Sequence, residues 1–338
     1  MVEKAPVISV VMPTYKRHEL LRRAIASVRA QTFTDWELII SDDERPAGAA
    51  FAETTAIAAQ DPRVRIVQNP NKPGQASNLN YACSLARGQW IKPLYDDDAF
   101  QPECLAEFYA VAQRVPSAAL IICGVDRYLD GALRAKGRVG AVPVRTLQQN
   151  AVHLAMYMQD ADLGTPIQAM IPRRVFFEHG VRFPESKTII SNVDTLWKAD
   201  VLVHGDLVEI LKPLVNQHQG SHETITAKMT TQMLFQEFYE LRSYFWDRIP
   251  ADVRAAGFVD VRTESGSQRV KVPPMRVAQG MQELVYAAVL AKKRQLLSAG
   301  LKVLSVPSVS AWSHFLRWAR HQRDPGSHDY VPRLPLRA

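Results

Sequence analysis

The first 125 residues alternate between short apolar runs rich in β-branched residues and longer segments with one apolar helical face. Val, Ile and Met dominate residues 7–12, which predicts a strand, and apolar residues recur every three or four positions over 18–31, which predicts a helix. The same signals predict further strands at 36–41, 64–67, 88–94 and 118–125, and helices at 51–60, 76–86 and 102–115. This alternation is typical of an α/β protein whose parallel strands are joined by crossover helices.

The rest of the chain is less regular. The pattern predicts strands at 167–171 and 208–211, the second ending before Pro213, helices at 148–158, 173–179 and 192–204, and a hairpin or loop over 130–145. After residue 225 it predicts helices at 229–248, 281–297 and 311–323, and a loop over 250–275. We therefore expect an α/β domain over 1–222 followed by a helical C-terminal region over 223–338.

Composition narrows the class of protein. Of 338 residues, 47% are hydrophobic and 22% charged, as in ordinary globular proteins. The three cysteines form no CxxC pair and are expected to be reduced thiols. No apolar run reaches the 18 or so residues that span a bilayer, and the N-terminus leads directly into a strand rather than a signal peptide. We expect a cytoplasmic protein, soluble or peripheral to the inner face of the membrane.

Carboxylates gather at the predicted carboxyl ends of two strands. Asp42-Asp43 follow the second strand, and Asp96-Asp97-Asp98 follow the fourth. In open α/β sheets, ligands bind where such strand ends meet. Adjacent carboxylates repel one another, and a divalent cation that holds a phosphorylated substrate would stabilise them. The alternative is a solvated acidic turn, since Asp is common in turns.

Four segments resemble glycosyltransferase family 2. They are Ile8-Ser9-Val10-Val11-Met12-Pro13-Thr14-Tyr15, Trp36 to Asp43, Asn69-Pro70-Asn71-Lys72-Pro73-Gly74, and Ala86 to Ile91 ahead of the aspartates. The end of the first helix, Ser27-Val28-Arg29-Ala30-Gln31-Thr32, resembles the family as well. The resemblance covers about 1–222. It implies a GT-A fold, a Rossmann-like mixed sheet flanked by helices, with a nucleotide-sugar-binding half (1–98) and an acceptor-binding half (99–222). It also implies an inverting enzyme of polysaccharide biosynthesis that transfers sugar from a nucleotide diphosphate, with UDP expected, to a hydroxyl of a glycan or lipid-linked glycan.

The same resemblance suggests which residues hold the nucleotide. Contacts to base and ribose fall on Pro13, Thr14 and Tyr15, with Tyr15 able to stack on a base. Asp42 and Asp43 would accept hydrogen bonds from a uracil N–H or a ribose hydroxyl. Lys72 and Gly74 would lie near the phosphates, and Asp96 or Asp97 would face the ribose or a metal-bound water. The plainer alternatives are a turn that ends the strand at 13–15 and a helix N-cap at Asp43.

The resemblance also suggests a metal site for Mn²⁺ or Mg²⁺. The ligand pair is Asp96 with Asp98 in one register and Asp97 with Asp98 in the other, so Asp98 is common to both. An imidazole that completes the site is expected from His218, with His222 as the rival. Oxygen ligands together with one imidazole suit these two cations.

The expected general base is Asp194, in the segment Ser191-Asn192-Val193-Asp194-Thr195-Leu196-Trp197. Family members carry an acidic pair here, and Val193 replaces its first member. The alternative is an Asp that favours the first turn of a helix through the helix dipole. Two further departures alter the nucleotide pocket, since Glu44-Arg45 replace a usual Gly-Ser pair and Leu79 replaces a usual Arg.

Basic residues concentrate near the C-terminus. The net charge is +7, and residues 286–323 contain seven Lys or Arg and no Asp or Glu. Residues 311–323 place two tryptophans and three arginines on an amphipathic helix, which predicts contact with an anionic membrane surface. Equally, the apolar face would pack on the catalytic domain or on a second copy in a homodimer. No nucleic-acid-binding motif accompanies the charge, so we do not expect a nucleic-acid partner.

Two other functions compete with glycosyl transfer. A sugar-phosphate nucleotidylyltransferase also uses metal-binding aspartates, but it typically has a Gly-rich loop after the first strand, and residues 13–17 contain no glycine. A sugar-nucleotide- or glycan-binding protein with a degenerate site is the non-enzymatic alternative, for which Leu79 and Val193 leave room.

Overall fold

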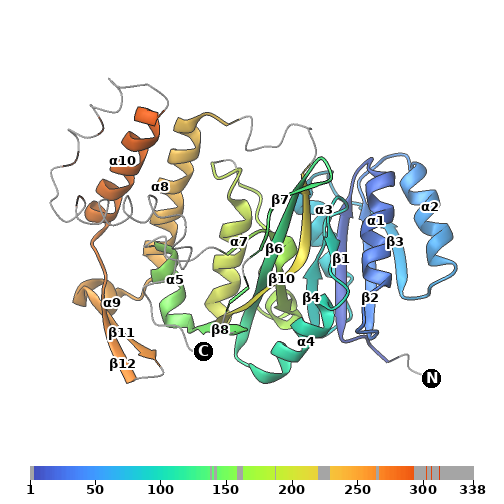
Figure 1. Ribbon diagram of the computed structural model, residues 1–338, viewed down its shortest axis with the longest axis horizontal. Coiled ribbons are helices and arrows are strands. Elements are labelled where there is room, and N and C mark those ends of the chain that lie inside the picture. The colour runs from blue at the N-terminus through green and yellow to red at the C-terminus, as the bar shows by residue number, and fades with distance from the viewer. Residues whose placement is uncertain are drawn as a thin grey trace.

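The computed structural model describes residues 4–137, 139–140, 143–157, 163–186, 188–219, 229–263 and 266–292, and the single residues Lys302, Val306 and Trp312. Its centre is a mixed sheet of order β3-β2-β1-β4-β9-β6-β10-β5 (Figure 1). These strands are β1 Ile8–Thr14, β2 Trp36–Asp42, β3 Val64–Gln68, β4 Trp90–Pro93, β5 Ala99–Phe100, β6 Ala118–Leu129, β9 Ala169–Pro172 and β10 Asp206–Gln219. The predicted mixed α/β architecture is confirmed.

The first four strands run parallel, as the alternation of strands and helices predicts. β1 pairs with β2 on one side and β4 on the other, and β2 pairs with β3. The intervening helices are α1 His18–Arg29, α2 Ala49–Ala58 and α3 Gln75–Ser84. Because side chains alternate along a strand, Val10 of β1 joins the core under α1 while Val11 joins the core under α3. The sheet is therefore covered by helices on both faces.

The second half of the sheet mixes directions. β9 runs antiparallel to both β4 and β6, whereas β10 runs parallel to β6 along almost its whole length. On its other side β10 pairs antiparallel with β5 and with β8 (Val144–Leu147), and β7 (Ala132–Ala135) forms a hairpin with β6. The helices of this half are α4 Cys104–Arg114, α5 Gln149–Tyr157, α6 Arg173–Phe177 and α7 Val193–Val201, with short 3₁₀ turns at Pro166–Gln168 and Leu202–His204.

The C-terminal region packs against this second half. It contains α8 Thr231–Arg248, α9 Ala251–Ala256, the hairpin β11 Phe258–Thr263 with β12 Gly266–Lys271, and α10 Met275–Lys292. Leu241 and Phe245 of α8 and Val259 of β11 belong to the same buried cluster as Leu79 of α3 and Trp197 of α7. One continuous core therefore joins the C-terminal region to the sheet, and the division at residue 222 remains a prediction.

Three predicted elements differ from the structure. The last strand does not end before Pro213, because β10 continues through it with register shifts on both sides of the proline. Residues 250–275 are not a loop but contain α9 and the β11–β12 hairpin. α10 begins at Met275, six residues before the predicted start. The predicted helix at 311–323 lies outside the described residues except for Trp312. In the part of the chain that the structure describes, no helix has both the length and the apolarity to cross a membrane.

Candidate functional site

The carboxyl ends of β1, β2 and β4 bring the predicted carboxylates to one edge of the sheet. Thr14 is the register partner of Asp42, and its Oγ1 donates a hydrogen bond of 2.7 Å to Asp96 Oδ2. The Asp43 backbone N–H donates to the Thr14 carbonyl at 3.1 Å. The aspartates at the end of β2 and those after β4 therefore lie together around Thr14, the last residue of β1, as expected for parallel neighbouring strands.

Two arginines of the segment after β1 neutralise part of the acidic cluster. Arg17 Nη1 lies 2.6 Å from Asp97 Oδ2 and 3.4 Å from Asp96 Oδ1, and Arg23 donates to the Asp97 carbonyl oxygen. Burial raises the pKa of Asp96 to about 6, helped by the charge of Asp97 and opposed by Thr14 and Arg17. Some of the positive charge that the three aspartates need is thus supplied by the chain itself.

Asp98 and His218 are neighbours across the sheet. The His218 backbone N–H on β10 donates to Asp98 Oδ1 at 2.8 Å, and the imidazole stacks on Tyr128 with centroids 4.8 Å apart. Burial, followed by the charges of Asp97 and Asp96, raises the pKa of Asp98 well above its ordinary value. Burial and the nearby Arg23 lower the pKa of His218, which favours the neutral imidazole that a metal requires. The rival His222 lies outside the described residues.

These residues fit a cation that is shared with a ligand rather than one enclosed by protein. Within the described ranges, no three His, Cys, Asp or Glu side chains converge into a metal cage. The His218 N–H occupies Oδ1 of the buried Asp98, so among the described residues Asp98 Oδ2 and the His218 imidazole remain to bind a cation. Mg²⁺ commonly uses one or two protein ligands and completes its shell with phosphate oxygens and water.

The aspartates that end β2 differ in their environments. Asp43 accepts 2.8 Å hydrogen bonds from Asn69 Nδ2 and from the Gly74 backbone N–H, so it ties β2 to the start of α3. Asp42 is fully buried, and its Oδ1 accepts from the Glu44 N–H at 2.9 Å while its Oδ2 has no hydrogen-bond partner among the described residues. Burial raises the pKa of Asp42. A buried acceptor without a donor is costly unless a ligand N–H or O–H reaches it.

The remaining predicted nucleotide residues lie at the rim of this edge. Pro13 is buried within β1, whereas Tyr15 is 53% exposed and precedes Lys16 in the left-handed region at φ 55°. Lys72 is exposed, and within the described residues it forms no hydrogen bond or ion pair with the carboxylates. Leu79, at the usual Arg position, is 1% exposed and packs in the core, so it supplies no charge.

Asp194 occupies the second position of α7, close to the acidic cluster. Its Oδ2 lies 3.2 Å from Nζ of Lys198, a fully buried side chain that also donates to the Gly164 carbonyl. The pKa of Tyr95 is raised first by burial and next by the charge of Asp194, followed by Asp98 and Asp97. The charges of Asp194 and of the aspartates that follow β4 therefore act on the same hydroxyl group.

Sequence reasoning missed three residues that shape this edge. They are Arg17, Asn78, whose Nδ2 donates to the Thr14 carbonyl at 3.2 Å, and Glu237 of α8, which binds the segment ahead of α7. A signal existed for Arg17, because it follows β1 closely and three adjacent acids need a cation. No local signal marks Glu237, which lies more than forty residues from its partners.

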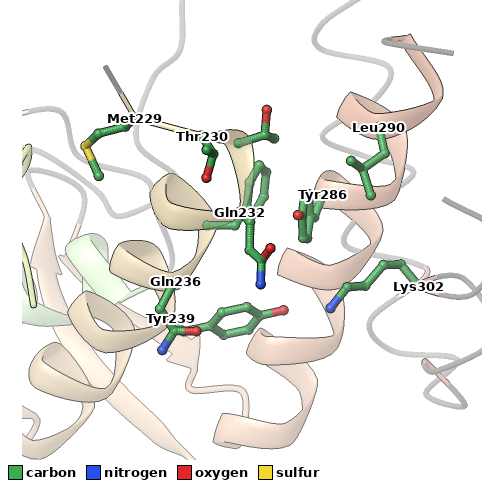
Figure 2. A pocket seen from close by; sticks show the side chains of 10 residues that line it. Met229, Thr230, Gln232, Gln236, Tyr239, Tyr286, Leu290 and Lys302 are labelled. Carbon is green, nitrogen blue, oxygen red and sulfur yellow. The ribbon is translucent and has the colours of Figure 1, made fainter. Parts of the chain in front are cut away.

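A cavity of about 720 Å³ opens between α8 and α10 (Figure 2). Its lining includes the aromatic rings of Phe235, Tyr239 and Tyr286 and the amides of Gln232 and Gln236. None of the predicted site residues lines it.

Comparison of the sequence with models of known protein families identifies the family of this chain. The model of the family described as Glycosyl transferase family 2 matches residues 9–177, which is half of the chain. The chain belongs to glycosyltransferase family 2. The matched segment contains β1 from its second residue, the aspartates at the ends of β2 and β4, and residues 99–177 of the predicted acceptor-binding half, whereas Asp194 and His218 lie beyond it.

Relatives and solved structures agree with this family. The "putative colanic acid biosynthesis glycosyl transferase WcaA" of Escherichia coli K12 is 35% identical over 116 residues, 34% of this chain and 41% of the relative. The "GalNAc(5)-diNAcBac-PP-undecaprenol beta-1,3-glucosyltransferase" of Campylobacter jejuni is 35% identical over 94 residues, 28% of this chain and 30% of that protein. The chain thus matches less than half the length of these relatives.

The fold is similar to that of solved glycosyltransferases. The structure of S. aureus TarS 1-349 in complex with UDP-GlcNAc superposes with a TM-score of 0.55 at 13% identity, covering 93% of this chain and 92% of that one. At this identity the likeness shows the fold alone, and the predicted GT-A fold is confirmed.

Proposed function

We propose that this protein is an inverting glycosyltransferase that moves a sugar from a UDP-sugar to a hydroxyl of a lipid-linked glycan. The observation that carries the proposal is the gathering of Thr14, Asp42, Asp96 and Asp98 with His218 at one edge of the sheet. Membership of the family supports glycosyl transfer. The Campylobacter relative, whose name specifies an undecaprenol-linked acceptor, supports the acceptor class.

The donor end of the site would be assembled by residues after β1, β2 and β4. Tyr15 offers an exposed ring for stacking on the base, and the unpartnered Asp42 Oδ2 offers an acceptor for an N–H or hydroxyl. Asp98 and His218 would hold Mn²⁺ or Mg²⁺ against the diphosphate. When bound, the cation supplies neutralisation of the charge that develops on the departing nucleotide.

The acceptor end would be provided by α7. Asp194 would take the proton from the acceptor hydroxyl as its oxygen attacks the anomeric carbon, while the bond from that carbon to the diphosphate oxygen breaks and the configuration inverts. Lys198 Nζ lies 3.2 Å from Asp194 Oδ2 and orients the carboxylate, so Oδ1 is the oxygen available to the proton. A base of this kind contributes about 10²- to 10⁴-fold to the rate.

Nucleotide release tests the proposed function. The protein would first be screened by thermal shift against UDP, GDP and their sugars with Mn²⁺, and then assayed for UDP release from each UDP-sugar. Stabilisation by UDP together with UDP release supports the enzyme. Stabilisation without release under any condition supports the alternative of a degenerate sugar-nucleotide-binding protein. Formation of UTP and sugar phosphate from the UDP-sugar when pyrophosphate is added would indicate a nucleotidylyltransferase.

Membrane contact is proposed separately, from charge. The seven basic residues between 286 and 323, with no acidic ones, would bring the protein to an anionic surface where a lipid-linked acceptor resides. Flotation with vesicles containing phosphatidylglycerol tests this. Equal flotation of the full chain and of a variant ending at residue 292 would contradict it.

A further inference from the structure

A carboxylate of the C-terminal region binds the chain segment that leads into α7. Glu237 of α8 is 1% exposed. Its Oε1 accepts from the backbone N–H groups of Ile190 and Ser191 at 2.6 and 3.0 Å. Its Oε2 accepts from Ser191 Oγ at 2.6 Å and from Asn192 Nδ2 at 3.0 Å. Four donors from three consecutive residues therefore converge on one buried carboxylate.

This arrangement fixes the start of α7. Asn192 directly precedes the helix, and its side chain binds Glu237 rather than capping the helix. Its carbonyl accepts the first helical hydrogen bonds, from Thr195 and Leu196. Because Asp194 lies two residues after Asn192, any shift of the 190–192 segment moves the Asp194 carboxylate as well.

The opposite half of α7 is held by the same helix. Asp200 accepts hydrogen bonds from Tyr244 and, at 2.7 Å, from Arg248, both on α8. α8 and α7 lie as neighbours in Figure 1. Helix α8 thus holds α7 at two points, of which only the Glu237 contact lies next to Asp194.

We propose that Glu237 is a positioning residue that holds Asp194 in place for proton transfer from the acceptor. This inference rests on the proposed function, in which Asp194 is the base. The interaction is suited to the task because hydrogen bonds to an ionised acceptor are shorter and stronger than those between neutral groups. A displacement of about 1 Å at a reacting group lowers a rate by about 100-fold.

The test separates rate from affinity. The rate of UDP release would be measured at saturation with an equimolar mixture of UDP-glucose, UDP-galactose and UDP-N-acetylglucosamine, and UDP affinity by calorimetry, both with Mn²⁺. For Glu237→Gln we expect a rate about 10- to 100-fold lower with UDP affinity changed by less than about twofold. Glu237→Asp keeps the charge and should recover part of the rate. An unchanged rate in Glu237→Gln overturns the proposal.

Two further variants distinguish positioning from general loss of stability. Tyr244→Phe removes a hydrogen bond from the other half of α7, and we expect lower stability at an unchanged rate. In an Asp194→Asn background, Glu237→Gln should lower the rate of UDP release by less than about twofold, because the carboxylate that Glu237 positions is gone. An equal cost in both backgrounds, or an equal loss of rate in Tyr244→Phe, would overturn the proposal.

Hydrogen exchange provides a readout that does not depend on turnover. The amides of Ile190 and Ser191 should exchange faster in Glu237→Gln than in wild type, and unchanged protection would contradict the contact. A wild-type protein that releases no UDP overturns the proposed function. An active wild type with an equally active Glu237→Gln variant overturns only the role of Glu237.

Discussion

Replacement of Asp194 by Asn should affect rate and stability for different reasons. The substitution keeps the shape of the side chain but removes the base and the negative charge beside Lys198. Without a base at this position, we expect the rate of transfer to fall by about 10²- to 10⁴-fold. UDP binding should be unchanged, because Asp194 lies on α7 and not on the strands that end at the proposed nucleotide site.

The expected stability cost follows from the ion pair. Lys198 Nζ lies 3.2 Å from Asp194 Oδ2, and the lysine side chain is fully buried while that of the aspartate is 20% exposed. Removing one partner of a buried pair typically costs about 3–5 kcal/mol. Lys198 also donates to the Gly164 carbonyl, and the Asn oxygen still accepts, so we expect about 1.5–3 kcal/mol, the value for a hydrogen bond to a charged group.

Two measurements keep these effects apart. UDP release would be followed at about 20 °C, where a loss of this size leaves the protein folded, and the free energy of unfolding would come from urea titration. Asp200→Asn is the matched control on the same helix, with an expected loss of stability and no loss of rate. Near wild-type transfer by Asp194→Asn with normal UDP affinity would refute the base, and an unchanged free energy of unfolding would refute the ion-pair argument.

Three further predictions concern metal, pH and packing. With UDP present, Mn²⁺ should raise the melting temperature of the wild type and EDTA should reverse the change, whereas Asp98→Asn should show no response by thermal shift. Burial lowers the pKa of His153 below 6.5, so the unfolded chain binds more protons as pH falls through that value. The free energy of unfolding should therefore decrease from about pH 7.5 to 5.5, and less steeply in His153→Gln. Gly88→Ala should cost about 1–3 kcal/mol in urea titration, because its Cβ would lie 2.6 Å from the Ser9 backbone nitrogen; an unchanged midpoint would contradict this.

Local patterns were sufficient to predict the strands and helices of residues 8–68. β1, β2 and β3 and the helices between them fall within two residues of their predicted bounds, because each is a short apolar element whose period is clear. The clustering of Asp42 with Asp96 followed from parallel pairing alone. The roles of the individual site residues remain predictions.

The incorrect or absent predictions concern segments where tertiary contacts override local sequence signals. Pro213 signals the end of a strand, yet β10 accommodates it at a shift of register, where a ladder N–H is not needed. The hairpin formed by β11 and β12 has strand-like alternation around Val259 and Val270, but neighbouring Gly, Pro and charge obscured it. The contact of Glu237 could not be predicted, because its partners lie more than forty residues away in the sequence and come close only in the folded chain.

The position of β10 in the sheet has a consequence for synthesis. β10 is the last strand of the central sheet to leave the ribosome, yet it inserts between β6 and β5. Before β10 inserts, β5 has no partner among the described strands. Asp98 then also lacks the hydrogen bond that the His218 N–H donates to it. A nascent chain that has already folded β1 to β4 therefore carries the aspartates that follow β4 before β10 supplies the partner of Asp98. A chain that stops short of residue 218 cannot form this hydrogen bond, and under the proposed function we expect it to leave nucleotide sugar unconsumed.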